Sequence, residues 1–447
     1  MNITLSEHQS TQSKHHRSLG HDFFVGLAIL IVSLAYFSGL SSTPFHPDES
    51  TQIFMSRDVD LFFSQPFRLF WREDKTQDPV QRYRLLDAPL TRYLIGVGRN
   101  VEGAQPALIS DWDWSKTWAE NELAGALPGE LLLLTARAAT AFLFPLTCWL
   151  IYVTGRTLGG NRMGWLAFLL FAGNALVLLH TRRAMAESVL LFTVSLTIFL
   201  VLRSPANPYL LALATALAFN AKQSALILFL WGAVALTFSD EKLISWQTRS
   251  LNLIKYVVLF VAIVFLLNPF LWNSPFKAMP AAWKARQELV EKQIVSFGAA
   301  APGQILHSPV QRLVGLIANL YIQPPQIAEA ENYSRETIEA ARAYFSNPLH
   351  TLLRGFVGGA LMAALTVFGF LLLLRQSMMK NSPNCRRAAV LLCIGGALQF
   401  VSLLVAVPLP FQRYVVPLIP FTCLYIAFGV IQPLLTKSAR ISWRITR

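Results

Sequence analysis

Long apolar runs separated by short polar stretches repeat along this chain. Ten of them reach, or nearly reach, the length of a helix that crosses about 30 Å of hydrocarbon. They cover residues 23–41, 131–154, 163–180, 187–203, 208–221, 223–238, 256–272, 354–374, 388–407 and 414–434. Backbone polar groups inside a bilayer must be satisfied within their own segment, so each run is predicted to be an α-helix. The pattern predicts an all-α polytopic integral membrane protein with about 10, and at most 12, transmembrane helices.

Two of these runs leave an alternative open. The fifth and sixth are short, and they form either two full crossings or a re-entrant pair, which gives the same orientation to the helices that follow. The first run is too long for the apolar part of a cleaved signal peptide, and the "HPDES" that follows it lacks the small residues of a cleavage site. It is therefore predicted to be the first transmembrane helix.

Two long polar segments interrupt the pattern, at about 42–130 and 273–353. In the first, "VDLFFSQPFRLFWRED" (residues 59–74) mixes aromatic with charged residues, which predicts an amphipathic helix at the membrane surface. The second contains "YSRETIEAARAYF", whose apolar residues also share a helical face. The expected organisation is a tail over 1–22, one transmembrane unit over 23–434 that includes both segments, and a basic tail over 435–447.

Composition and charge place this bundle in a membrane and orient it. Mean hydropathy is +0.44, and 14% of the residues are charged, against about 25% in soluble domains. With the N-terminus inside, the inner segments hold 16 of the 38 Lys and Arg residues but four of the 25 Asp and Glu residues. This bias predicts cytoplasmic N- and C-termini. The net charge of +13 is thus a topology signal, and no nucleic-acid partner is expected.

An acidic pair follows the first apolar run. "STPFHPDES" (residues 42–50) places Asp48 and Glu49 together, with His46 two residues earlier. The pair is either a solvated loop feature or a reactive one, because adjacent carboxylates near an apolar surface repel and one can gain a raised pKa suited to a general base. His46 either tunes the pair or is an ordinary loop histidine.

Basic residues recur where the outer ends of the helices are expected. Arg137 lies within an apolar run, where it either snorkels to the interface or has a function. "LLHTRRAMAES" holds Arg182 and Glu187, which could form a structural ion pair. The full set is Arg92, Arg137, Arg182, Lys222 and Arg413, accompanied by Asp87 and Tyr414. Together they predict a cationic ring on one membrane face, beside the acidic pair.

Such a ring suits an anionic ligand that enters from lipid. A polyprenyl phosphate fits, because Arg and Lys bind phosphate and the isoprenoid tail can lie between apolar helices. The rival interpretation is a membrane transporter or lipid flippase, which usually carries its ionisable groups near the bilayer midplane and shows internal repeats. No acidic cluster demands a metal, so no cofactor is expected to be required, although a divalent metal stays possible. The four cysteines offer neither an outer disulfide nor a Cys–His metal pattern.

An ordered set of motifs resembles one family of enzymes. The set comprises "HPDES", "DAPLTRYLIG", "RAATAFLFPLTCWLIYVTGRTLGGNRMGWLAFLL", "RRAMAES", "LAFNAKQSAL", "NPFLW" and "RYVVPLIP". In order and spacing it is similar to phospholipid-carrier-dependent glycosyltransferases of the GT-C fold, which include the protein O-mannosyltransferases of family 39 and the aminoarabinose transferases. The segment 273–353 has no match in that pattern. The run from Asp87 to Arg92 departs from it, with Ala88 in place of the first proline and Arg92 in place of lysine.

The resemblance implies a function and roles for the residues. It implies an inverting transfer of a sugar from a polyprenyl phosphate to an acceptor hydroxyl on a lipid, glycan or protein, at the outer face of the plasma (inner) membrane. Asp48 would be catalytic, with Glu49 as its partner. The donor phosphate would be bound by Arg92, Arg137, Arg182, Lys222 and Arg413, with His46, Asp87, Glu187 and Tyr414 in support. Neither the sugar, the acceptor nor the oligomeric state can be predicted from the sequence.

Overall fold

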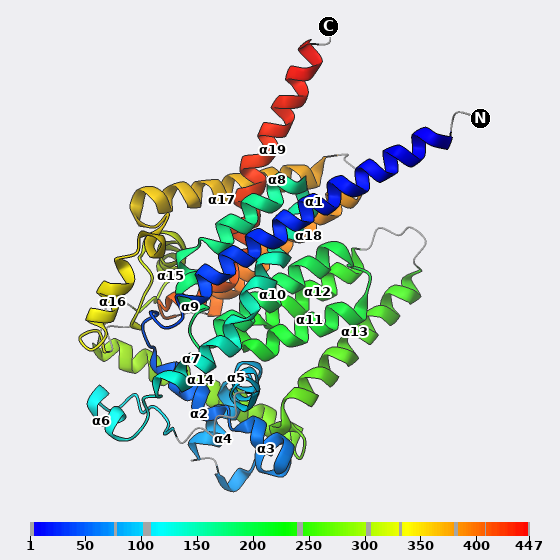
Figure 1. Ribbon diagram of the computed structural model, residues 1–447. Helices are drawn as coiled ribbons and strands as arrows, with labels where there is room; N and C mark the ends of the chain where they lie inside the picture. Colours follow the sequence, from blue (N-terminus) through cyan, green and yellow to red (C-terminus); the bar gives the residue numbers. More distant parts are fainter. Residues whose placement is uncertain are drawn as a thin grey trace.

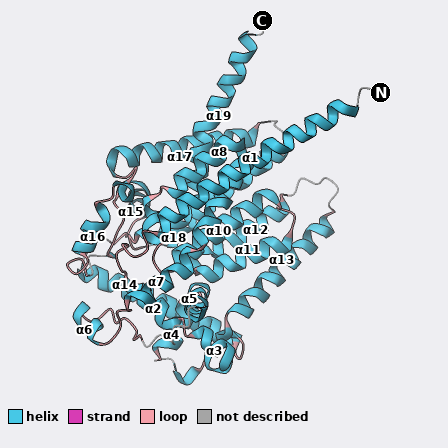
Figure 2. Cartoon of the chain, in the orientation of Figure 1, coloured by secondary structure: helices cyan, strands magenta, loops and turns pink. Residues whose placement is uncertain are grey.

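Figure 1 shows the computed structural model of the chain, which describes residues 4–75, 78–101, 109–238, 245–300, 305–329, 333–379, 383–406 and 408–445. These residues form helices joined by loops and turns, with no strand among them (Figure 2). The predicted all-α class is confirmed. Both termini lie at one end of the helix bundle, and the short helices α2 to α6 lie at the opposite end (Figure 1).

The long helices follow the apolar runs. They are α1 (Thr4–Phe37), α7 (Glu130–Ala141), α8 (Leu143–Ala172), α10 (Ala186–Arg203), α13 (Trp246–Leu267), α17 (Gly355–Met378), α18 (Pro383–Ala406) and α19 (Ile419–Ile445). By length and composition, 7 helical segments of the described chain suit a membrane crossing, with α7 and α8 counted as one. The shorter α11 (Pro208–Ala221) and α12 (Ile227–Thr237) cover the fifth and sixth runs. The lengths of α11 and α12 fit either two full crossings or a re-entrant pair, so both alternatives given by the sequence stay open.

The second and third predicted spans meet in a reversal within α8. Gly159 and Gly160 leave helical geometry, and Gly160 has a φ of 78°, which favours glycine. The two halves then run back against each other, since a Cβ added to Gly155 would lie 3.0 Å from the Cα of Gly164. Nine residues of straight helix would separate these positions by about 13 Å. The sequence prediction of two helices here therefore matches the packing.

Further helices build the end of the bundle opposite the termini. The first long polar segment forms α2 (Pro47–Met55), α3 (Asp58–Ser64), α4 (Pro79–Leu86), α5 (Leu90–Val101) and α6 (Trp118–Leu123). The second forms α14 (Pro275–Ala300), α15 (Pro309–Ile317) and α16 (Ile338–Phe345), and α9 (Ala175–His180) lies between α8 and α10. The single amphipathic helix predicted over 59–74 is wrong. α3 ends at Ser64 and a separate 3₁₀ turn begins at Pro66, because proline cannot continue the hydrogen bonding of a helix interior.

The apolar core joins the central helices. Phe168, Val194, Ala212, Trp231 and Phe421 are all at most 1% exposed, and they come from α8, α10, α11, α12 and α19. α17 lies so close to α19 that a Cβ on Gly369 would collide with the backbone of Tyr425. Small residues that let helix backbones approach are characteristic of packing inside membranes. This core holds the N-terminal ends of α10 and α19 in place, where the polar residues described next are found.

Candidate functional site

His46 starts helix α2 and thereby orients both carboxylates. It is the N-cap: its Nδ1 accepts from the Asp48 amide at 3.1 Å, and its own amide donates to Glu49 Oε1 at 3.0 Å. This reciprocal pair is a capping box, and Pro47 occupies the first helical position, where a missing N–H costs nothing. Burial lowers the pKa of His46 well below its usual value. His46 is therefore a neutral, structural residue of the loop.

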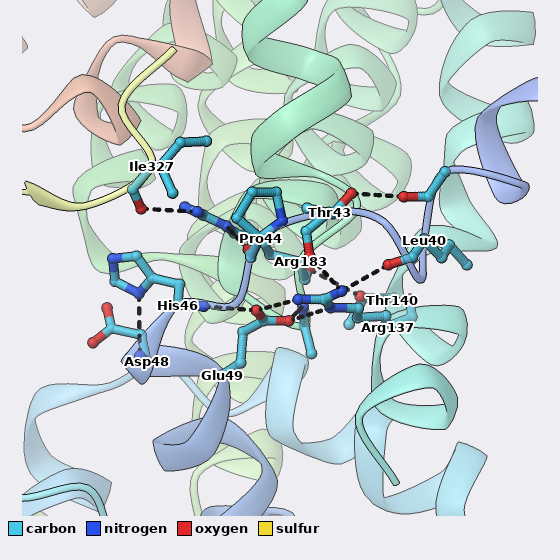
Figure 3. Close-up of polar contacts among 12 residues, drawn as sticks. Leu40, Thr43, Pro44, His46, Asp48, Glu49, Arg137, Thr140, Arg183 and Ile327 are labelled. Atoms are coloured by element: carbon cyan, nitrogen blue, oxygen red, sulfur yellow. Dashed lines mark hydrogen bonds and ion pairs between the residues drawn. The ribbon is translucent and has the colours of Figure 1, made fainter. Parts of the chain in front are cut away.

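Glu49 points into a buried network (Figure 3). Its carboxylate accepts from Arg137 Nε at 2.7 Å, from Arg137 Nη2 at 2.8 Å and from the Ala184 amide at 2.9 Å, in addition to the His46 amide. Arg137 also donates to the carbonyls of Leu40 and Thr43. Glu49 is 0% exposed. With four donors around it, Glu49 holds the loop in place and has no free oxygen for a substrate.

Arg183 ties a second segment to the same loop. Its Nε donates to the Pro44 carbonyl at 3.1 Å, and its Nη2 donates to the Ile327 carbonyl at 2.8 Å (Figure 3). Ile327 belongs to the second long polar segment, which had no match in the sequence motifs. Through Arg183, that segment is fixed beside α2.

Asp48 faces away from Glu49 and pairs with Arg413. Its Oδ2 accepts from Arg413 Nη1, and its side chain is 27% exposed, so it remains accessible. Burial raises the pKa of the Asp48 carboxyl, but the charge and the hydrogen bond of the Arg413 guanidinium outweigh burial and hold the pKa at about 2. The expectation that repulsion within the pair raises one pKa is thus wrong for Asp48, because the two carboxylates point to different cations.

Glu329 is a third carboxylate here, and sequence reasoning missed it. Its Oε1 lies 3.1 Å from Arg413 Nε, on the same guanidinium that binds Asp48. Glu329 is 8% exposed, and burial raises its pKa to about 7, against the opposing charge of Arg413. A pKa near neutrality is the one suited to general-base chemistry. Arg413 therefore bridges one firmly ionised carboxylate and one that titrates near physiological pH.

A second ion pair lies beside the cluster formed by Asp48, Glu329 and Arg413. Lys222 Nζ donates to Glu187 Oε1 at 2.8 Å, and the ammonium lies 5.3 Å from the centre of the Tyr414 ring. Lys222 caps the C-terminal end of α11, and Glu187 lies in the first turn of α10. The Glu187 side chain is buried, whereas that of Lys222 is 20% exposed. Lys222, Glu187 and Tyr414 thus lie together beside Arg413.

Two of the predicted cations are engaged elsewhere. Arg182 donates to the Tyr36 carbonyl and lies 3.0 Å from His350 Nε2, so the predicted Arg182–Glu187 ion pair is wrong. Arg92 lies 3.2 Å from Asp58, to which Arg84 also binds. Both arginines are at most 5% exposed. Their contacts hold loops and helices together, as those of Arg137 do.

Asp87 lies at the edge of the cluster with a further cation. It is the C-cap of α4, and its backbone carbonyl accepts from Arg92 Nη1. Burial raises the pKa of the Asp87 carboxyl, with the charges of Arg92 and Arg286 acting against burial. Arg286 comes from α14, in the segment that the motifs do not cover. Among the described residues, no three His, Cys, Asp or Glu side chains gather closely enough to hold a metal.

An apolar cavity of about 160 Å³ opens near this end of the bundle. It is bounded mainly by α8, α19 and the loop residues 352–354, and its lining includes Leu166, Leu170, Leu320, Met362 and Ile426. The α19 part of the lining spans Thr422–Ile426, while Arg413 precedes the same helix by six residues. At 1.5 Å per residue, the cavity lies within about 10 Å of the start of α19.

Comparison with known proteins identifies the fold. No protein-family profile matches the sequence. No curated protein matches it either. Among solved structures, the chain is similar to the oligosaccharyltransferase of Archaeoglobus fulgidus crystallised with Zn and sulfate, with 13% identity and a TM-score of 0.50 over 94% of this chain. Two further structures of oligosaccharyltransferases from this archaeon, one with an inhibitory peptide and a dolichol-phosphate and one without ligands, give 14% identity and a TM-score of 0.47 over the same share. This chain covers 50%, 51% and 52% of the lengths of these three neighbours, so it spans about half of each. The chain therefore has a fold resembling that of the GT-C oligosaccharyltransferases.

Proposed function

We propose that this chain is an inverting glycosyltransferase that moves a hexosyl or pentosyl group from a polyprenyl-phosphate donor to an acceptor hydroxyl. The observation that carries the proposal is the cluster of Asp48, Glu329, Arg413 and Lys222. Carboxylates can orient and deprotonate a hydroxyl, and cations can stabilise a leaving phosphate. A fold resembling a glycosyl-transferring enzyme is consistent with this chemistry.

The proposed step is a direct displacement. The acceptor oxygen attacks C1 of the sugar, while the bond from C1 to the phosphate oxygen breaks and its electron pair leaves with the polyprenyl phosphate. The hydroxyl proton passes to a carboxylate of the protein. One displacement inverts the configuration at C1, and no nucleotide or oxidant is needed for the atoms and electrons to balance.

The two carboxylates take different roles in this proposal. Asp48, whose pKa is about 2, accepts a hydrogen bond from the acceptor hydroxyl and orients it. Glu329, whose pKa is about 7, takes the proton as the new bond forms. Glu49 supports both roles by fixing the start of α2. The motif resemblance makes Glu49 the partner of Asp48, and it would act as that partner through this anchoring.

Lys222 and Arg413 are the proposed phosphate ligands. Their side chains are 20% and 15% exposed, whereas Arg92, Arg137 and Arg182 are buried in contacts within the protein. In this proposal Arg92, Arg137 and Arg182 support donor binding through the loops that they hold in place. The apolar cavity beside α19 would take part of the isoprenoid tail, because it lies along the helix that Arg413 precedes.

The two carboxylates do not suit a divalent ion in this arrangement. Asp48 and Glu329 both bind the Arg413 guanidinium, which occupies the position that a shared cation would need. The proposed mechanism therefore contains no metal-dependent step. The zinc in the neighbouring crystal structure belongs to that protein, and transfer with and without a chelator measures whether this chain uses one.

The proposed orientation places the cluster at the outer face of the plasma (inner) membrane. Both termini lie at the end of the bundle opposite α2, the helix that carries Asp48 (Figure 1), and the inner segments carry the excess of basic residues. The acceptor is then a protein, lipid or glycan hydroxyl outside the cytoplasm. Membrane transport is the alternative, and it is disfavoured because the ionisable cluster lies at one end of the helices rather than midway along them.

Transfer of radiolabelled sugar from polyprenyl-phosphate donors, in membranes with matched expression, tests the proposal. Asp48→Asn and Glu329→Gln should each lose about 10²-fold or more, the usual range for a proton-handling or orienting side chain. Asp74→Asn and Glu336→Gln, which alter exposed acids, are the matched controls. If the wild type transfers nothing from any lipid-linked sugar, the transport alternative replaces this proposal.

A further inference from the structure

The first half of α14 carries an apolar face that the rest of the described chain leaves largely exposed. Phe276, Met279 and Trp283 are 93%, 61% and 70% exposed. Their spacing of three and four residues places them on one side of the helix. Three large apolar side chains gathered in this way mark a contact surface.

The opposite face of the same helix is already packed. Ala278, Ala281, Ala282 and Ala285 contact an apolar cluster that includes Trp71, Leu85, Phe270 and Leu271. The side-chain amide of Asn273 donates to the Trp71 carbonyl at 2.9 Å, and the backbone amide of Trp71 donates to the Phe270 carbonyl. α14 therefore has small residues toward the protein and large ones away from it, and inward rotation cannot bury the large ones without exposing the packed alanines.

The connection to α13 indicates what covers this face. α13 ends at Leu267, eight residues before α14 begins, and its Val258, Val261 and Leu266 are each more than half exposed, as lipid-facing side chains are. Trp272 lies between the two helices and donates to the Phe265 carbonyl at 2.7 Å. The exposed face of α14 thus starts where a lipid-exposed helix leaves the membrane.

The charges along α14 point the same way. Residues 275–286 include Lys277, Lys284 and Arg286 and no acidic residue, while Glu288 and Glu291 follow in the second half. Lysine beside aromatic residues is characteristic of helices that lie in the headgroup region. A second copy of the chain or a soluble partner would not require the first half of α14 to be free of acidic residues while the second half carries them.

We infer that Phe276, Met279 and Trp283 insert into the lipid surface at the end of the bundle that carries α2 to α6, and that α14 is an interfacial anchor. The inserted face would hold α14 at a fixed height. The alanines on the other face of α14 pack against α4, which ends beside Asp87. The anchored helix would therefore fix how far α4 and Arg286 lie from the membrane surface. This inference does not depend on the reaction proposed above.

A spin label placed on this face tests the inference in the full chain. Cys148, Cys385, Cys393 and Cys423 are replaced by alanine, and a nitroxide is attached at Met279→Cys or, as a matched control in the same helix, at Lys292→Cys. The protein is reconstituted in phosphatidylcholine nanodiscs. Oxygen, which concentrates in lipid, and a nickel chelate, which stays in water, are then used as relaxation agents. Both label positions are exposed, so labelling should leave the fold intact, and thermal unfolding of each labelled protein verifies this.

Insertion predicts a several-fold higher ratio of oxygen to nickel accessibility at residue 279 than at residue 292. High nickel accessibility at both positions would overturn the inference, since the face would then be in water. Low accessibility to both agents at residue 279 would also overturn it, because a protein surface would then cover the face. Dipolar broadening between labels at residue 279 would identify that surface as a second copy of the chain.

Discussion

The buried carboxyl of Glu329 provides the sharpest test of the site. Burial raises its pKa from 4.5 to about 7, although Arg413 attracts its charge. A pKa higher by about 2.5 corresponds to about 3–4 kcal/mol, at about 1.4 kcal/mol for each tenfold change in the protonation equilibrium. Between these two values the folded protein keeps a proton that the unfolded chain has lost. Stability therefore falls as pH rises from 4.5 to 7, and the cost persists at higher pH.

Glu329→Gln removes the titrating group and keeps the shape. Near pH 4.5 the wild-type carboxyl is neutral in the folded state, so variant and wild type should unfold at nearly the same temperature. At pH 8 the variant should be more stable, by up to about 3–4 kcal/mol. Unfolding of the purified proteins in one detergent, followed by tryptophan fluorescence at pH 4.5, 6 and 8, measures the difference. Glu336→Gln, at an exposed position in the same segment, should show no such dependence on pH.

The opposite sign would refute this reasoning. If Glu329→Gln is the less stable protein at pH 8, the ion pair with Arg413 outweighs burial and Glu329 is charged at neutral pH. The kinetic counterpart is a transfer rate that rises through about pH 7 in the wild type. That rise should be absent from whatever activity Glu329→Gln retains, and its persistence would assign the proton to another group.

Three other substitutions probe separate parts of the molecule. Glu49→Gln leaves a buried guanidinium without its charged partner and should destabilise the fold by about 3–5 kcal/mol, seen as a loss of folded protein on size-exclusion chromatography. Lys222→Gln should weaken binding of polyprenyl phosphate by about tenfold in a competition assay, equivalent to about 1.4 kcal/mol, and Lys222→Arg should restore much of it; equal binding by all three proteins would remove this residue from the phosphate site. Gly369→Ala should lower the unfolding temperature, because its Cβ collides with the backbone of α19, whereas Gly26→Ala, which has no atom within 4 Å, should not.

The helices could be predicted because the bilayer imposes a length and a composition on them. Each predicted run has a helix, including the two that reverse at Gly159–Gly160. The polar segments were less predictable. Their helices are short and end at local features, as at Pro66, and their positions depend on contacts such as that between Arg183 and Ile327, which are 144 residues apart.

The site was predictable in part. The ordered motifs supplied Asp48, Lys222 and Arg413, and the structure brings these three together with Glu187. Glu329 had no local signal, because it is one of several acids in its segment and its pairing with Arg413 spans 84 residues. Sequence alone also cannot separate a cation that is available to a ligand from one that neutralises a buried acid. Arg137 is the clearest case, since its position inside an apolar run suits either role.

The acidic pair at the mouth of the first helix has a geometric explanation. Successive residues of an α-helix point about 100° apart, so two neighbouring carboxylates in the first turn of α2 cannot face the same partner. His46 and Pro47 set where that turn begins, and the turn directs Glu49 inward to Arg137 and Asp48 outward to Arg413. One acid can then stabilise the loop while the other stays accessible at a fixed position. Because His46 bonds both the Asp48 amide and the Glu49 carboxylate, the cap helps to fix the direction of both acids.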